Sequence, residues 1–503
     1  MSQRKQHAPR RASRKPPASG RKPTGRLTTR DIATSADELL AFQAHFDALF
    51  ARQEQRDWFR FYLCGQLSNL KRKTVEPMVL ALLGVNESVI RTAQHFLGQA
   101  LWETEPFLEH AQDLVAEWLG EPDGVVIVDG SGFPKQGTHS VGVGRQYCGH
   151  LGKVANCQEG VFILYSSRRG YAFLDKRLYV LEDWFTADYG DRWKACGIPE
   201  TLSFHTEPEL GLEMITALIE RAALPFRWVT CDARYGEIPA FLDGIAALGK
   251  WYFAEGAVDT RVWRRTPPVE PPGRSLLGRP RTHPRVKRTA PRPYEMRELV
   301  TQVPAAQWHR YIIKEGSQGP LAAEFACMRV TPIRDELPGQ RCWAIFRRTL
   351  GPQAEVKFFL SNAPLTCTLQ EFARVSGLRW PIETGLEEGK GEVGMDQYET
   401  RTWLGWHHHM TQSILAHLFL VRLQLVFQKK SRVDHRAGSS THCARHRRRP
   451  REIARYLGDS ALSSAPELCC LSCAPQADTC TTWPLPVTAT QTQNPVIVPY
   501  FSL

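Results

Sequence analysis

The chain has 503 residues, of which 42% are hydrophobic and 23% are charged, and this balance is typical of a globular protein of two or three domains. Its formal net charge of +12 favours a polyanionic partner, nucleic acid first, although a basic enzyme of another kind would share it. Runs of apolar residues stay too short to predict a membrane span, and 13 cysteines, an odd number in a large chain, argue against a disulfide framework and for the cytoplasm.

The N-terminal segment is strongly basic. Residues 1–30 contain ten Lys or Arg and no Asp or Glu, with Pro, Ser and Gly between them. Such a composition cannot bury a core, so residues 1–32 are expected to be a disordered basic tail. The tail is either a solubilising segment or a non-specific DNA-binding arm. It has no apolar stretch of the kind that a secretory signal needs.

Residues 33–120 are predicted to form a helical N-terminal domain. Leu39, Phe42, Phe46 and Leu49 recur at helical spacing, and a second apolar stretch starts at Val79. An all-α domain ahead of a basic core suits DNA-end binding, but a structural cap on the core is an equal alternative.

From Gly124 the pattern changes to strands, and residues 121–430 are predicted to form one catalytic α/β domain. Residues 125–128 and 226–231 are short apolar runs, each followed by an aspartate, and helices and further strands follow them. This order indicates a mixed α/β sheet.

Residues 264–361 interrupt that domain. Residues 264–293 hold eight prolines and many arginines, which indicates a linker or an exposed basic loop, and residues 299–361 read as a β-rich insertion. Helices are expected again from Thr368. Residues 431–503 form a disordered or atypical tail, native or frame-shifted, whose cysteines lack the spacing of a zinc site.

Two aspartates share one context. Asp129 and Asp232 each follow a hydrophobic strand, at the end where ligands bind in open α/β sheets. On adjacent strands their carboxylates would repel each other unless a cation lay between them, and oxygen ligands suit Mg²⁺ or Mn²⁺. Either aspartate alone would more often cap the following helix.

A third acidic residue lies between two cations near the end of the predicted core. Arg379, Glu383 and Lys390 are separated by four and seven residues, so on a helix they share one face. This stripe suits a metal-bound phosphodiester, with Glu383 on the metal and the cations on phosphate. A solvated charged face is the alternative, since other glutamates lie nearby.

These residues resemble the DDE-type transposases of bacterial insertion sequences. The similarity is to the branch whose third motif is Tyr, two residues, Arg, three residues, Glu, six residues, Lys; the Tyr position is Ser376 here. Residues 129–149 resemble the first catalytic block of a subgroup of these enzymes, residues 231–236 the second, and residues 403–409 the segment after the third. Residues 65–77 are similar to that subgroup's helical N-terminal domain.

The resemblance implies a ribonuclease H-like core that holds two divalent metal ions, Mg²⁺ or Mn²⁺. Asp129, Asp232 and Glu383 would be the catalytic and metal-binding residues, with Asp129 bridging both ions. The DNA-phosphate contacts expected from the sequence are Arg379, Lys390, Lys135 and Arg145.

The implied function is transposition, meaning metal-dependent cleavage and strand transfer at the ends of a mobile element. The expected partners are double-stranded DNA, as terminal inverted repeats and target, and a second copy of the chain in a homodimer on DNA. The expected location is the bacterial cytoplasm, in association with the nucleoid. A catalytically inactive DNA-binding relic and another ribonuclease H-like nuclease are the alternatives.

Overall fold

The computed structural model describes residues 29–273, 282–316, 319–351 and 353–436. The expectations of disorder in residues 1–28 and of an atypical tail in residues 437–503 lie outside these ranges. Within them, helix α1 begins at Thr29 and helix α13 ends at Arg436. Helix therefore also covers residues 29–32 and 431–436, which were predicted from the sequence to belong to the tails.

The first part of the chain is helical, as the sequence predicts. Asn86 caps one of its helices, because the side-chain oxygen accepts hydrogen bonds from the backbone N–H groups of Ser88 and Val89, at 3.0 and 3.3 Å. The aromatic rings of Phe46, Phe59 and Phe107 gather between the helices, with centroids 5.8 to 5.9 Å apart. The helices are α1 (Thr29–Ala44), α2 (Gln53–Leu67), α3 (Val75–Leu82), α4 (Glu87–Gly98) and α5 (Glu105–Leu119).

A five-stranded mixed sheet forms the centre of the protein. Its strands are β1 (Val125–Pro134), β3 (Lys153–Ser166), β4 (Tyr171–Tyr179), β5 (Trp228–Cys231) and β6 (Trp251–Gly256). Their order is β4-β3-β1-β5-β6; β3 is antiparallel to both β1 and β4, whereas β1, β5 and β6 are parallel. This order and these directions define a ribonuclease H-like core, and the predicted α/β fold class is confirmed.

Helices cover both faces of this sheet. Helix α7 (Glu207–Arg221) packs its Met214 and Leu218 with Val126 and Val128 of β1. The alternate residues of β1 face the other way, toward α11 (Leu369–Gly377) and α12 (Pro381–Val393). The short helices α8 (Ala233–Gly236) and α9 (Pro239–Ala247) connect β5 to β6.

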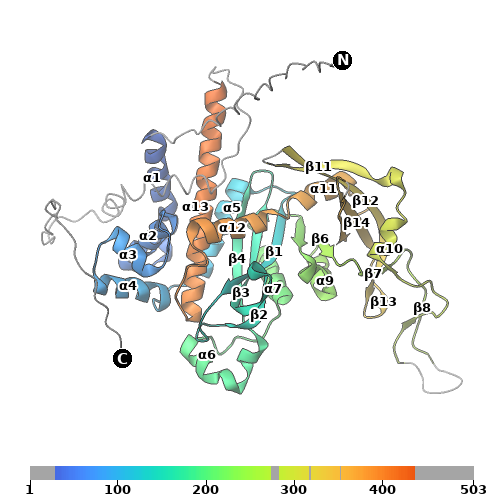
Figure 1. Ribbon diagram of the computed structural model, residues 1–503, viewed down its shortest axis with the longest axis horizontal. Helices are drawn as coiled ribbons and strands as arrows, with labels where there is room; N and C mark the ends of the chain where they lie inside the picture. Colours follow the sequence, from blue (N-terminus) through green and yellow to red (C-terminus); the bar gives the residue numbers. More distant parts are fainter. Residues whose placement is uncertain (1–28, 274–281, 317–318, 352, 437–503) are drawn as a thin grey trace, which may run out of the picture.

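The β-rich insertion continues the same sheet. Strand β15 (Val356–Ser361) pairs with β6, followed by β14 (Cys342–Thr349) and β12 (Gly319–Arg334). Figure 1 shows the insertion at one end of the protein and the N-terminal helices at the other. The remaining elements are β2 (Gly144–Cys148), α6 (Gly190–Cys196), β7 (Arg261–Trp263), β8 (Val269–Glu270), β9 (Arg285–Val286), β10 (Tyr294–Glu295), α10 (Met296–Thr301), β11 (His309–Gly316) and β13 (Leu337–Pro338), with short 3₁₀ turns between them. With strands β2, β7, β10, β11 and β13, the whole sheet has 13 strands.

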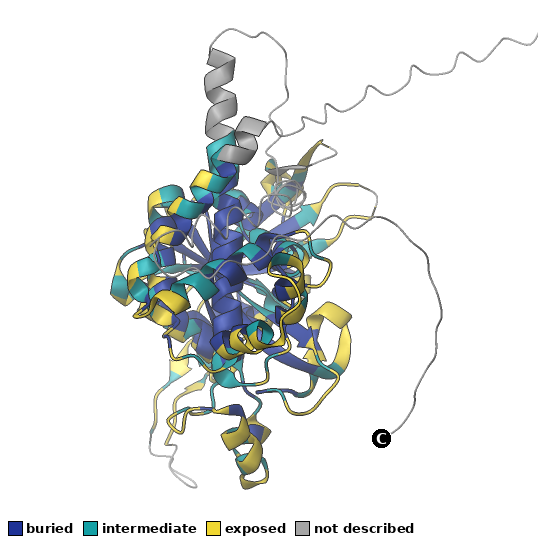
Figure 2. Cartoon of the chain, turned by 90° about the vertical axis from the view of Figure 1, so that its left-hand side faces the viewer, coloured by how far each residue is buried: buried dark blue, intermediate teal, exposed yellow. Residues whose placement is uncertain are grey.

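The long helix α13 (Trp403–Arg436) runs through the interior of the protein over the segment Trp403–Phe427. Its segment Trp403–Phe427 is long and apolar enough to cross a membrane by length and composition, but 72% of the most apolar window is buried inside the protein. That burial is what a core helix requires. Figure 2 shows the buried residues gathered at the centre, with exposed residues around them.

Candidate active site

The two aspartates lie side by side where β5 ends; β1 continues to Pro134, so the expectation that Asp129 follows the end of its strand is wrong. Strands β1 and β5 pair in register up to Val128 and Cys231. The next residues are Asp129, which lies within β1, and Asp232, which directly precedes α8. Neighbouring strands are about 4.8 Å apart. Both aspartates are half-buried, and alternation along β1 places Asp129 on the same face as Ile127, toward α12.

Burial and mutual repulsion oppose ionisation of both carboxyls. The pKa of Asp129 is raised to about 7, first because the group is buried and then because Asp232 lies beside it. The Arg379 guanidinium and the Gly130 N–H, which donates to Asp129 Oδ1 at 2.9 Å, act in the other direction. Burial also raises the pKa of Asp232. Its Oδ1 is buried and has no hydrogen-bond partner among the described residues.

The third acidic residue comes from α12. Pro381 occupies the first turn of this helix, and Arg379 lies just before it. The Arg379 side chain folds back, so that Nη2 donates to Glu383 Oε1 at 2.9 Å, and its Nε lies 3.9 Å from Glu255 Oε2. Arg379 is buried, whereas 51% of the Glu383 side chain is exposed. Both residues influence the pKa of Asp129, which places them at the same site.

The residues present fit a divalent cation once Glu383 turns. Among the described residues, no group of three or more metal-ligating side chains is close enough to hold an ion, and Glu383 is paired with Arg379. A cation between Asp129 and Asp232 would relieve their repulsion and satisfy the unpartnered Asp232 oxygen. A carboxylate-only donor set suits Mg²⁺ or Mn²⁺.

The other predicted phosphate contacts lie in different surroundings. Lys390 Nζ donates to Gly132 O at 3.0 Å and so ties α12 to β1. Lys135 Nζ donates to Tyr398 O at 3.3 Å, and burial lowers its pKa to about 8. Arg145 is exposed on β2. The structure therefore brings Arg379 to the carboxylates, uses both lysines in interior contacts, and leaves Arg145 at the surface.

Ser376, at the position of the motif's tyrosine, is buried in α11. Its Oγ accepts a hydrogen bond from Arg347 Nη1 at 2.9 Å. The departure from the motif therefore lies inside the protein, in contact with the insertion strand β14.

The sequence did not reveal a second polar cluster behind Asp129. Glu159 of β3 and Glu207 of α7 both contact Arg234, at 3.7 Å for Glu159 and closer for Glu207. A Cβ on Gly130 would lie 2.8 Å from Glu159 Oε1, so this glycine makes room for the cluster. Burial and Glu207 raise the pKa of Glu159 to about 8. The glycines that follow Asp129 were the one sequence signal of this cluster. The side chains that they make room for are distant in the sequence.

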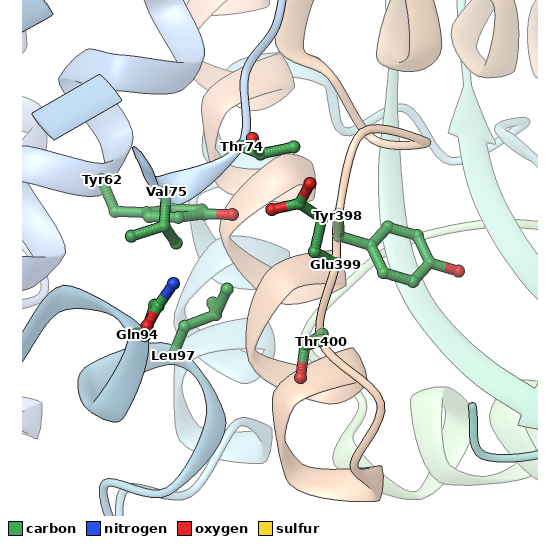
Figure 3. Close-up of a pocket in the computed structure, with 8 residues that line it drawn as sticks. All are labelled: Tyr62, Thr74, Val75, Gln94, Leu97, Tyr398, Glu399 and Thr400. Carbon is green, nitrogen blue, oxygen red and sulfur yellow. The ribbon is translucent and has the colours of Figure 1, made fainter. Parts of the chain in front are cut away.

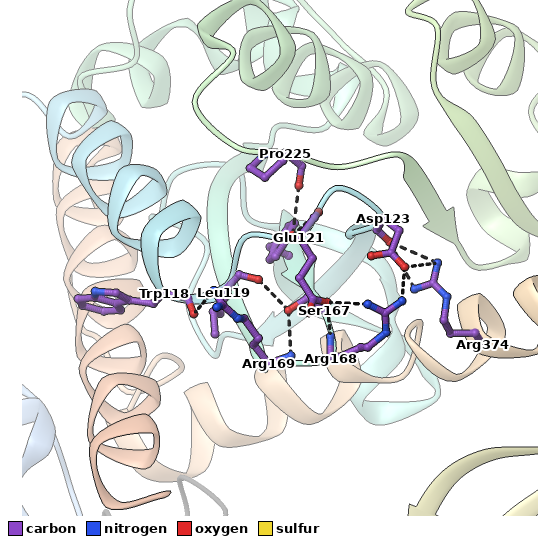
Figure 4. Close-up of polar contacts among 10 residues, drawn as sticks. Trp118, Leu119, Glu121, Asp123, Ser167, Arg168, Arg169, Pro225 and Arg374 are labelled. Carbon is purple, nitrogen blue, oxygen red and sulfur yellow. Dashed lines mark hydrogen bonds and ion pairs between the residues drawn. The ribbon is translucent and has the colours of Figure 1, made fainter. Parts of the chain in front are cut away.

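A salt-bridge network fixes the third motif relative to β1. In Figure 4, Asp123, in the loop before β1, lies between Arg168 and Arg374, whose guanidinium groups both pair with its carboxylate. Arg374 also donates to the Asp123 carbonyl at 3.3 Å. Since Arg374 belongs to α11, the network ties the helices of the third motif to the start of β1.

The three consecutive histidines of α13 are buried and point to separate partners. His407 Nδ1 lies 3.0 Å from Lys176 Nζ, His408 contacts Leu97 O and Trp102 O, and His409 Nδ1 lies 2.8 Å from Tyr62 Oη. They are packing residues. Figure 3 shows a cavity between α2–α4 and the segment after α12, and none of the three carboxylates lines it.

Comparison with known proteins identifies the family. The family described as "DDE superfamily endonuclease" matches residues 45–320, more than half of the chain, and the chain belongs to it. The matched residues include Asp129 and Asp232 and end before Glu383. The assignment of Glu383 as the third carboxylate therefore rests on its position in the structure.

The chain is also similar to a probable transposase for insertion sequence element IS701 from Microchaete diplosiphon. The identity is 28% over 193 residues, which are 38% of this chain and 46% of the relative. The chain thus matches about half the length of that relative. The predicted resemblance to DDE-type transposases is confirmed, whereas the branch defined by the third motif stays a prediction.

Two solved structures are similar at low scores. The piggyBac transposase synaptic complex with hairpin DNA matches with a TM-score of 0.37 and 10% identity, over 86% of this chain and 78% of that one. The NurA nuclease from Sulfolobus solfataricus matches with a TM-score of 0.23 and 10% identity, over 67% of this chain and 94% of that one. The fold assignment rests on the strand order.

Proposed function

We propose that this DDE superfamily endonuclease is a transposase that cleaves and joins DNA at the ends of a mobile element. The observation that supports it most is the in-register pair Asp129 and Asp232 beneath Glu383 of α12. A pair of half-buried carboxylates with raised pKa values, next to a half-exposed glutamate and a buried arginine, suits phosphodiester chemistry.

Asp129, Asp232 and Glu383 would together hold two divalent ions. Bound there, Mg²⁺ or Mn²⁺ would activate water or a DNA 3′-hydroxyl and stabilise the leaving oxygen. Glu383 would have to leave Arg379 for this role, and the guanidinium would then be free to bind a DNA phosphate. Lys390 would hold α12 against β1, and Lys135 would hold the segment around Tyr398 near the site. Arg145 would contact phosphate at the surface.

The proposed partners are the terminal inverted repeats and the target DNA. A homodimer is the proposed assembly, because two ends must be held together for strand transfer. The proposed location is the cytoplasm, in association with the nucleoid.

Cleavage of a defined substrate tests the proposal. A duplex carrying the inverted repeats that flank the gene is incubated with the protein and Mg²⁺ or Mn²⁺. We expect cutting at the repeat ends and its loss, by at least about a hundredfold, in Glu383→Gln. The matched control is Glu387→Gln, an exposed residue one turn further along α12, which should cleave like the wild type.

Two other outcomes would identify the alternatives. Salt-sensitive binding of the repeats without cleavage would falsify the transposase in favour of a DNA-binding relic. Metal-dependent cutting that ignores the repeats would indicate another ribonuclease H-like nuclease.

A further inference from the structure

A β-hairpin beside the candidate site presents an unpartnered face. Strand β2 (Gly144–Cys148) and the first residues of β3, from Lys153 to Cys157, form its two arms. The connection closes at Gly152, whose φ of +62° suits glycine. A Cβ on Gly149 or Gly152 would meet nothing within 4 Å, so the turn projects into open space.

The outward face of this hairpin is apolar at its centre. Tyr147 and Val154 are directly opposite each other across the two strands, and 53% and 54% of their surfaces are exposed. Leu151, in the turn, is 42% exposed. Large apolar side chains gathered at an exposed tip indicate a surface that another molecule covers.

The charged side chains of the hairpin itself are all basic. Between Lys135 and Gln158 the chain has no Asp or Glu, but it has Arg145, His150 and Lys153 on or beside the hairpin. Arg145 lies on the same strand face as Tyr147, two residues away. A cationic rim around apolar side chains is complementary to a partner with an anionic exterior and stackable apolar groups inside, which describes duplex DNA.

The hairpin is anchored next to the carboxylates. The Sγ of Cys148 lies 2.6 Å from where a Cβ of Gly132 would be, and Cys148 Cα lies 3.4 Å from it. Gly132 is three residues beyond Asp129 on β1, or about 10 Å along the strand. A duplex whose major groove alone is about 12 Å wide would reach the hairpin when one of its phosphates lies at Asp129. An anionic membrane has the same chemistry, but this location favours DNA.

We propose that Tyr147, Leu151 and Val154 enter the base stack of the DNA beside the scissile phosphate and unstack it locally. Arg145 and Lys153 hold the flanking phosphates. The proposal rests on the proposed function, since it takes the DNA at the carboxylates as given. An unstacked base step bends the duplex, so that more of it can contact the protein beside the carboxylates.

Fluorescence of 2-aminopurine tests this wedge without requiring cleavage. The base is placed at successive positions around the repeat end, and the full-length protein is added in Ca²⁺, or as Glu383→Gln in Mg²⁺. We expect a severalfold rise in fluorescence at one or two steps with the wild type and its loss in Tyr147→Ala/Val154→Ala. Ile312→Ala, which removes an exposed apolar side chain on β11, should keep the full signal.

Affinity for a duplex with unpaired bases gives a second readout. The double variant should bind paired DNA about tenfold more weakly than the wild type, and a duplex already unpaired at the responsive step should restore most of the loss. Equal fluorescence and binding in wild type and double variant would overturn the wedge, even if the protein cleaves normally. A variant defect confined to anionic phosphatidylserine vesicles would overturn it in favour of a membrane. A fluorescence rise without cleavage would support the wedge while the proposed transposase fails.

Discussion

Asp129 has a raised pKa and is also a proposed metal ligand, so its protonation affects metal binding. A carboxyl with a pKa of about 7 is largely protonated below neutrality, whereas a metal ligand must be deprotonated. Its pKa is raised above the ordinary value of 3.8, so its contribution to stability is present at low pH and is lost as the pH rises through about 7. The metal-free protein therefore carries an unfavourable charge pair at pH 8.

Metal ions should stabilise the protein in a pH-dependent way. At pH 8 a cation meets two ionised aspartates and removes their repulsion, but at pH 6 it must displace a proton from Asp129. We expect the rise in Tm caused by Mn²⁺ or Mg²⁺ to be larger at pH 8 than at pH 6, as measured by calorimetry in both buffers.

The variant Asp129→Asn is the control for this effect. It removes one negative charge from the pair, so the metal-free protein should be more stable than the wild type at pH 8, and the response of Tm to metal should disappear. An equal metal response in wild type and Asp129→Asn would show that the stabilising ions bind elsewhere.

At the residue scale, sequence patterns located the carboxylates but not their partners. Asp129 and Asp232 were recognisable because each follows a short hydrophobic run, and Glu383 because of its spacing from Arg379. The contacts of Glu159 and Glu255 could not be predicted, because they depend on which distant strands and helices meet. Lys135 shows the same limit, since its contact with Tyr398 joins residues 263 positions apart.

At the scale of the elements, helix α8 packs closely against β6 next to the site. Asp232 directly precedes this helix, and Gly236 ends it against β6. A Cβ on Gly236 would lie 2.0 Å from the carbonyl oxygen of Glu255, which is backbone and cannot turn away. A side chain there would push α8 off the sheet and displace Asp232.

Gly236→Ala should therefore lower the free energy of unfolding by about 2–4 kcal/mol, as measured by urea denaturation. Gly190→Ala is the matched control: this glycine begins α6 with an ordinary φ of −54°, and its Cβ would meet nothing within 4 Å. That variant should stay within about 1 kcal/mol of the wild type. Similar losses in both variants would contradict the close approach of α8 to β6.

The elements themselves were largely predictable. Apolar runs bounded by glycine or proline indicated β1 and β5, and helical periodicity indicated the N-terminal helices. The pairing of β6 with β15 was not predictable, because about a hundred residues separate the two strands. The alternation of residues along a strand does not tell which other strand pairs with it. The insertion consequently read as a separate β-rich stretch, whereas it extends the catalytic sheet.

At the scale of the whole molecule, α13 joins the N-terminal helices to the sheet. Ser413 Oγ accepts from Gln66 Nε2 at 2.7 Å, and His409 contacts Tyr62, so α13 bonds to α2. The same helix bonds to the sheet side through His407 and Lys176. One continuous hydrophobic cluster contains residues from α1 to α13, including Phe42, Val128 and Phe419.

This shared core predicts that the catalytic half does not fold alone. A chain starting at residue 121 would expose the buried face of α13, including His408 and His409, which lose their partners Leu97, Trp102 and Tyr62, and burial without those partners is costly. We expect this fragment to lack a cooperative thermal transition, whereas residues 29–436 unfold in a single transition by calorimetry. Co-expression of residues 29–120 as a separate chain should restore the transition, because it supplies the missing contacts without the covalent link. A fragment from residue 121 that unfolds cooperatively by itself, near the Tm of the longer chain, would show instead that the helical part is an independent domain resting on a complete catalytic core.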